Sequence, residues 1–129
     1  MPDVLVEVRG DWLGARKPQF LDAVHSALVE AIKIPADDKV LRIVTHARED
    51  FVVPPARGER FTRIEIAMFA GRSLEAKRKL YQAIVRNLEP FGVPAMDIKI
   101  VLVEIPAENW GVRGGRAASD IDLGFEVKV

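Results

Sequence analysis

The segment HSALVEAIKIPADD, residues 25–38, has a counterpart later in the same chain, YQAIVRNLEPFGVPAMD, residues 81–97. The first five positions of each segment match in residue type, and each segment ends in an apolar residue, a proline, an alanine and a nearby aspartate. The second segment differs by an insertion of three residues. Because each segment begins within an apolar stripe of helical spacing and leads into an alternating stretch, the sequence indicates a tandem duplication of one structural unit.

Each copy of the repeat is predicted to be a strand, a helix and a second strand. Strand-type alternation predicts strands at residues 4–8, 39–45, 63–69 and 98–105. Pro18 suits the first turn of the first helix, and Ser73 can cap the second helix. The apolar stripes expected to bury these helices are Phe20, Leu21, Val24, Leu28 and Ile32, and then Leu80, Tyr81, Ile84, Val85 and Leu88. Residues 48–60, rich in proline and glycine, are predicted as a hairpin or excursion without a core of its own.

Two such units predict the overall architecture. A right-handed crossover makes its two strands parallel and places the helix on one face of the sheet. The expected fold class is therefore α/β (α+β), a four-stranded sheet with two helices on one face, in a single domain over residues 1–129 with pseudo-repeats at about 2–60 and 61–117. The other face would expose Val, Ile and Leu, so oligomerisation is expected. Residues 110–129 are predicted to form a short hairpin and then a C-terminal strand, 118–129, free to cross to a neighbouring subunit.

Composition excludes several classes of function. The 19 basic and 19 acidic side chains balance, so no general attraction to nucleic acid or to an anionic membrane is expected. No apolar run approaches the roughly 20 residues of a membrane span and no signal-peptide layout is seen, which predicts a cytoplasmic protein. The chain has no cysteine, and its two histidines are far apart, so no metal site is expected.

Pro2 follows the initiator Met1 and directly precedes the first predicted strand. Removal of Met1 would leave a secondary amine, which serves as general base, general acid or nucleophile. A free α-amino group titrates near ~7.7 to 8.0; an apolar pocket favours its neutral, basic form, whereas a nearby carboxylate favours the cation. The structural alternative is a proline at a strand edge, where the missing N–H costs little.

Together these features resemble the tautomerase superfamily, and most closely its malonate semialdehyde decarboxylase-like branch, over nearly the whole chain. The motifs that carry the resemblance are Pro2, Ile34-Pro35-Ala36-Asp37-Asp38, Ala70-Gly71-Arg72-Ser73 and the segment ENWGVRGGRA at residues 108–117. The resemblance implies a tautomerase/macrophage migration inhibitory factor-like fold and a homotrimer. It also implies chemistry without a cofactor, in which the mature proline moves protons on small carboxylated keto or enol compounds.

The resemblance also assigns roles to individual residues. Pro2 takes the catalytic acid/base role, and Asp38 the role of a carboxylate that orients or activates substrate or water. Arg72 takes the role of binding the substrate carboxylate. Trp110 and Val112 fall where the family has apolar residues of the pocket wall.

Some assignments stay open at this stage. Ala70 stands where the founding decarboxylases carry a second arginine, which leaves one fewer fixed cation for a dicarboxylate or a 3-oxo acid. The alternative activity is that of a malonate semialdehyde-type decarboxylase or hydratase, and the alternative from another class is a non-catalytic trimeric binding or signalling protein. Asp37 is a rival to Asp38, and the sequence does not assign roles to His25, His46, Arg113 and Arg116.

Overall fold

The computed structural model describes residues 2–129 of the chain. Its main elements are β1 (Asp3–Arg9), α1 (Lys17–Ile32), β2 (Val40–His46), β3 (Thr62–Phe69), α2 (Leu74–Leu88) and β4 (Ile98–Ile105), followed by a short hairpin of β5 (Gly111–Val112) and β6 (Arg116–Ala117). Short 3-10 helices lie at Gly14–Arg16, Arg48–Asp50, Glu89–Phe91, Ala95–Asp97, Ala107–Asn109 and Ala118–Asp120. The duplicated strand–helix–strand pattern is therefore confirmed.

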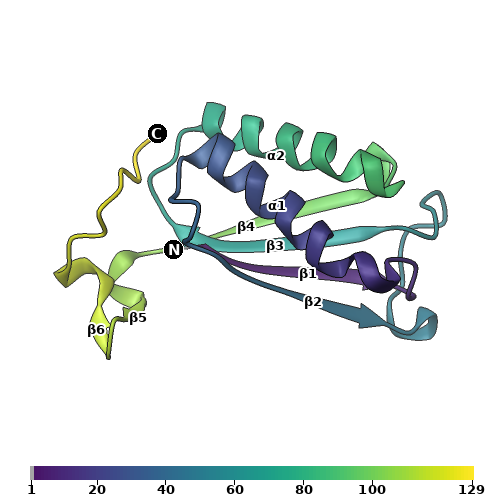
Figure 1. Cartoon of the computed structure of the whole chain (residues 1–129), viewed down its shortest axis with the longest axis horizontal. Helices are drawn as coiled ribbons and strands as arrows, with labels where there is room; N and C mark the ends of the chain where they lie inside the picture. The colour runs from purple at the N-terminus through teal and green to yellow at the C-terminus, as the bar shows by residue number, and fades with distance from the viewer. Residues whose placement is uncertain (1) are drawn as a thin grey trace.

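The four long strands form one sheet in the order β2-β1-β3-β4. β1 is parallel to β2 and β3 is parallel to β4, while the two halves join through antiparallel pairing of β1 with β3. Both helices lie across the same face of this sheet (Figure 1). This architecture confirms the prediction of a four-stranded sheet with one helix layer. Both helices lie on the same face because each right-handed parallel crossover places its helix there.

The core lies between the helices and the sheet. Alternate residues of β1 and β3 point into it, and the central ones, such as Val6 and Ile64, are fully buried. α2 buries Leu80, Ala83, Ile84 and Leu88 against the sheet. Tyr81 and Val85, predicted in the same stripe, are only partly buried and line a shallow surface groove with Gln82, Arg86 and Glu89. That part of the prediction was wrong because each of these two residues lies about 100° further around the helix than a core residue.

The face without helices is not the apolar surface that was predicted. The strand register places several charged side chains there, and they form ion pairs across the strands. Glu7 contacts both His46 (3.0 Å) and Arg63 (3.3 Å), and Asp3 contacts Arg42 (2.5 Å). Apolar residues lie among these pairs, and Val40, Val44 and Val103 are between 38% and 49% exposed. The face is therefore a mixture of ion pairs and exposed valines.

The predicted C-terminal strand is absent from the single chain that the structure describes. The hairpin expected in residues 110–129 is present, but Ala118–Asp120 is a 3-10 helix and residues 121–129 carry no strand. After the hairpin the tail returns toward the start of α2 (Figure 1), where the backbone N–H of Ser73 donates to the carbonyl of Val129 at 3.0 Å. A strand needs a continuous backbone partner, and this return path meets α2 instead of a sheet edge.

Within residues 2–129, no helix combines the length and the apolar character needed to cross a bilayer.

Candidate active site

The predicted site residues gather at one end of the sheet. β1 and β2 begin at this end, and β3 and β4 finish there (Figure 1), as the pairing of Asp3 with both Val40 and Ala67 requires. Pro2 directly precedes β1 and is buried. Asp38 lies two residues before β2, and Arg72 lies three residues after β3. The topology therefore brings together three residues that are far apart in the sequence.

Arg72 is a buried arginine, with only 5% of its surface exposed. Its Nη1 donates to the carbonyl of Phe69 at 3.2 Å, whereas Nε and Nη2 are buried and have no hydrogen-bond partner among the described residues. Burial lowers the pKa of Arg72, while the negative charges of Glu104 and Asp38 act in the opposite direction. Buried donors in proteins are normally hydrogen-bonded, and a guanidinium with two unbonded donors has the chemistry to bind a carboxylate.

The electrostatic contact with Arg72 also identifies Glu104, which the sequence analysis missed. Glu104 pairs with Met68 in the β3–β4 register, so its side chain leaves the sheet on the helix side. Its carboxylate accepts a hydrogen bond from Nζ of Lys77 at 2.7 Å. The available signal was an acidic residue on the same side of the strand as Ile98, Ile100 and Leu102, where the other residues are apolar.

Asp38 is partly buried and Asp37 is exposed, and both line a cavity of about 350 Å³. The remaining lining residues are Pro35, Arg113, Leu123 and Phe125. The equivalent aspartate of the second half, Asp97, lies elsewhere and accepts a hydrogen bond from the backbone N–H of Gly58 at 3.0 Å. Of the two repeated aspartates, one therefore anchors a loop and the other borders a cavity.

Trp110 contacts Phe69, the residue whose carbonyl accepts a hydrogen bond from Arg72. Its ring meets Phe69 edge to face, with centroids 5.2 Å apart, and its Nε1 donates to the carbonyl of Ile105 at 3.2 Å. Phe69 is also the residue whose carbonyl binds Arg72. Val112 is partly buried in β5, where it pairs with Arg116, and it does not line the cavity. Trp110 and Arg72 therefore both contact Phe69, whereas Val112 lies on the hairpin and does not border the cavity.

The two histidines lie at different places in the fold. Nε2 of His25 is 2.7 Å from the carbonyl of Ala36, in the loop that follows α1. His46 ends β2, at the opposite end of the sheet from Pro2, and contacts Glu7 on the face without helices. Over residues 2–129 no group of three histidine or acidic side chains is placed to hold a metal ion.

Comparisons with known proteins identify the family of the chain. The family model described as "Tautomerase enzyme" matches residues 38–113, more than half of the chain. The 2-hydroxymuconate tautomerase of Comamonas testosteroni is 35% identical over 51 residues, which cover 39% of this chain and 81% of that protein. The chain therefore belongs to the tautomerase family of enzymes.

Solved structures extend the likeness beyond the matched segment. FG41 malonate semialdehyde decarboxylase, inhibited by 3-bromopropiolate, superimposes with a TM-score of 0.82 and 29% identity over 89% of this chain and 92% of that one. A fused 4-OT described as a symmetric trimer gives a TM-score of 0.80 and 26% identity over 90% of this chain and 95% of its own. Within the tautomerase superfamily, the chain lies in the malonate semialdehyde decarboxylase-like branch.

Proposed function

We propose that this chain is a cofactor-independent enzyme that uses Pro2, after removal of Met1, to transfer protons on small carboxylated keto or enol compounds. The observation that carries the proposal is the buried guanidinium of Arg72, which has two unbonded donors and lies within the electrostatic reach of Asp38. The guanidinium belongs to the same end of the sheet as Pro2, which is buried. A carboxylate bound there would bring the carbon skeleton of a small substrate near the proline nitrogen.

The proposed chemistry divides among three groups. Arg72 holds the substrate carboxylate by charge-assisted hydrogen bonds. The amine of Pro2 takes the proton of an enol hydroxyl and returns a proton to carbon, giving the keto form. Asp38 orients the substrate or water in this step. Trp110 is proposed as an apolar wall of the substrate site. Val112 is proposed as a wall that another subunit would complete, since it does not line the cavity in one chain.

We further propose a homotrimer of single-domain subunits. The support is the mixed face without helices, whose exposed valines need cover, and the C-terminal tail, which has no strand partner in one chain. The similarity to a fused 4-OT described as a symmetric trimer favours three copies.

Decarboxylation is the second candidate activity. It is supported by the 29% identity to a malonate semialdehyde decarboxylase over most of both chains. In this version the protonated Pro2 polarises a carbonyl group and Asp38 positions water. Release of carbon dioxide from malonate semialdehyde distinguishes this activity from enol–keto conversion.

The decisive experiment compares two forms of the protein that differ only at the N-terminus. Intact mass identifies the form that has lost Met1, and an added N-terminal residue gives a form in which the nitrogen of Pro2 remains an amide. With phenylenolpyruvate, the free amine should be about 10² to 10⁴ times more active, the usual effect of one acid/base group. Pro2→Ala should retain part of the activity because it keeps a primary amine. Equal rates in the blocked and free forms would remove the proline from the mechanism and favour a binding protein.

A further inference from the structure

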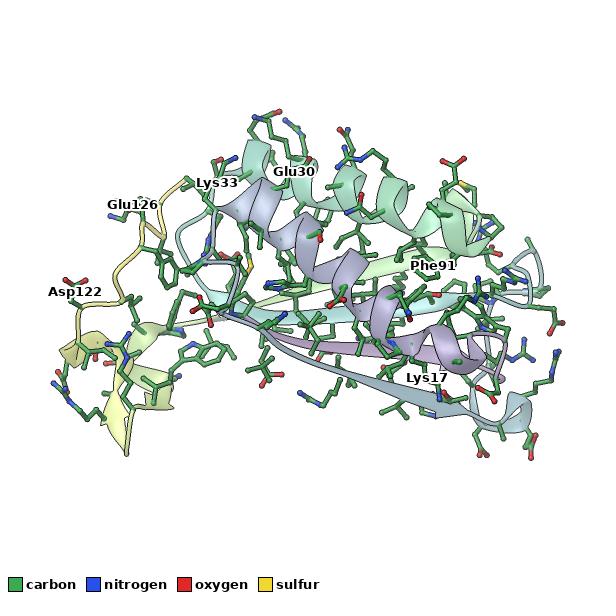
Figure 2. All side chains as sticks on the ribbon, in the orientation of Figure 1. Lys17, Glu30, Lys33, Phe91, Asp122 and Glu126 are labelled. Carbon is green, nitrogen blue, oxygen red and sulfur yellow. The ribbon has the colours of Figure 1, made fainter. Side chains whose placement is uncertain are left out.

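The tail that follows the β5–β6 hairpin has an inner and an outer side. In residues 121–129 the odd-numbered side chains, all of them apolar, are partly buried, while the even-numbered residues are exposed. Phe125 and Val129 pack against the hydrophobic core. Figure 1 shows this segment in yellow, running from the hairpin toward the start of α2, and Figure 2 shows Asp122 directed away from the body of the molecule. The alternating pattern therefore fixes the tail on the body without forming a strand.

The end of the tail contacts the residues on both sides of Arg72. The backbone N–H of Ser73 donates to the backbone oxygen of Val129 at 3.0 Å. A Cβ on Gly71 would lie only 3.3 Å from Cγ1 of Val127, so the tail packs directly on this glycine. The φ of Gly71 is 133°, a conformation that side chains rarely adopt. Glycine at this position therefore permits both the turn of the loop and the close approach of the tail.

These contacts bear on how a ligand reaches Arg72. Its Nε and Nη2 are shielded from solvent and have no hydrogen-bond partner among the described residues. A carboxylate from solvent can bind these donors only after a covering segment has moved. The tail is the segment suited to this movement, because two hydrogen bonds, from Ser73 and from Arg113, hold residues 122–129 to the rest of the described chain. Segments with so few bonds to the body open locally at lower cost than helices and sheets do.

We propose that residues 121–129 form a strap that closes over the loop of Arg72 and opens to admit a carboxylate ligand. In the closed state the strap rests on Gly71 and Ser73, and in the open state the guanidinium meets solvent. The fraction of open molecules then limits how often a ligand can reach the arginine. This inference rests on the proposed role of Arg72 in binding a carboxylate and adds the step that exposes it.

Chemical modification of Arg72 by 2,3-butanedione measures the opening without any substrate. This small reagent reacts with the guanidinium groups that it can reach, and peptide mass identifies each arginine that has reacted. Val127→Gly removes the side chain that packs on Gly71, so we expect Arg72 to react about three- to tenfold faster in this variant. Hydrogen exchange at the amide of Ser73 should accelerate by a similar factor, because the same opening breaks its bond to Val129.

Val52→Gly is the matched control, since Val52 is 91% exposed on the loop between β2 and β3. It should leave both rates at the wild-type value. Arg78, on the exposed surface of α2, is an internal standard that should react equally in all three proteins. Equal rates for Arg72 in the wild type and in Val127→Gly would overturn the strap. So would a wild-type Ser73 amide that exchanges as fast as an unstructured chain.

Two further measurements locate the effect. The buried amides of β1 should exchange at the wild-type rate in Val127→Gly, and an equal acceleration there would overturn the strap by placing the change in the whole fold. Phenylpyruvate should protect Arg72 from the reagent in the wild type. Absence of protection would contradict the proposed carboxylate-binding role of Arg72, whereas the exposure measurements, which use no ligand, would still decide whether the strap opens.

Discussion

At the scale of single residues, Arg72 is a buried charge whose proposed role is to bind the substrate carboxylate. The residue is 5% exposed, and its guanidinium donates one hydrogen bond to the carbonyl of Phe69. Desolvation penalises the buried cation, and the carboxylates of Glu104 and Asp38 offset part of this cost. Two of its donors, Nε and Nη2, have no partner among the described residues, and the proposed substrate carboxylate would bind them.

Arg72→Met should therefore separate ligand binding from folding. Methionine fills similar space without charge, so we expect KM for phenylenolpyruvate to rise by about 10- to 100-fold, from the loss of a charged hydrogen-bonded pair of ~1.5 to 3 kcal/mol. Arg78→Met, on the exposed surface of α2, is the control and should leave KM unchanged. Denaturant unfolding checks that both variants fold. An unchanged KM in Arg72→Met would make the arginine a structural residue.

At the scale of elements, the junction of β3 and α2 positions the guanidinium of Arg72. Ser73 is the N-cap of α2, and its Oγ accepts a hydrogen bond from the N–H of Ala76 at 3.1 Å. The backbone N–H of Ser73 holds the returning tail through Val129. One residue therefore ends the loop that carries Arg72, begins the helix and anchors the C-terminal segment.

Ser73→Ala should lower the free energy of unfolding by about 1 kcal/mol, because it removes an N-cap side chain from α2. The contact with the tail uses the backbone and should persist. Ser26→Ala is the control: Ser26 is exposed within α1, and alanine at that position should be neutral or slightly stabilising. Urea unfolding of the two variants measures the difference, and equal stabilities would show that the cap contributes nothing.

At the scale of the whole molecule, the face of the sheet without helices is the surface proposed for contacts between copies of the chain. Ion pairs such as Glu7 with Arg63 cross its central strands, and exposed valines lie on its outer strands. A mixed surface of this kind suits an interface in which charges are paired and apolar side chains are covered. The proposed trimer would use this face.

Val103→Asp should dissociate the proposed trimer, because it places an unpaired charge on the interface side of β4, where Val103 is 38% exposed. Sedimentation of the wild type should give about three times the 14.4 kDa of one chain, and the variant should approach one chain. Val52→Asp is the control, since Val52 is 91% exposed on the loop between β2 and β3. A wild-type monomer at micromolar concentration would contradict the trimer.

The sequence by itself determined the elements and their order. Alternation identified the four strands, helical spacing identified both helices, and Ser73 was correctly predicted as a cap, because each of these signals depends on residues close in the chain. The internal repeat then predicted the parallel pairs and the single helix layer. Arg72 and Asp38 could be nominated from short motifs for the same local reason.

Only the tertiary structure decided which of these residues meet. The approach of Glu104 to Arg72, the placement of Arg113 beside Asp38 and the return of the tail to Ser73 join segments about 30 to 75 residues apart. The tail also shows why a strand-like pattern is insufficient: alternation in residues 121–129 forms no strand in a single chain, because a strand requires a backbone partner that local sequence does not specify.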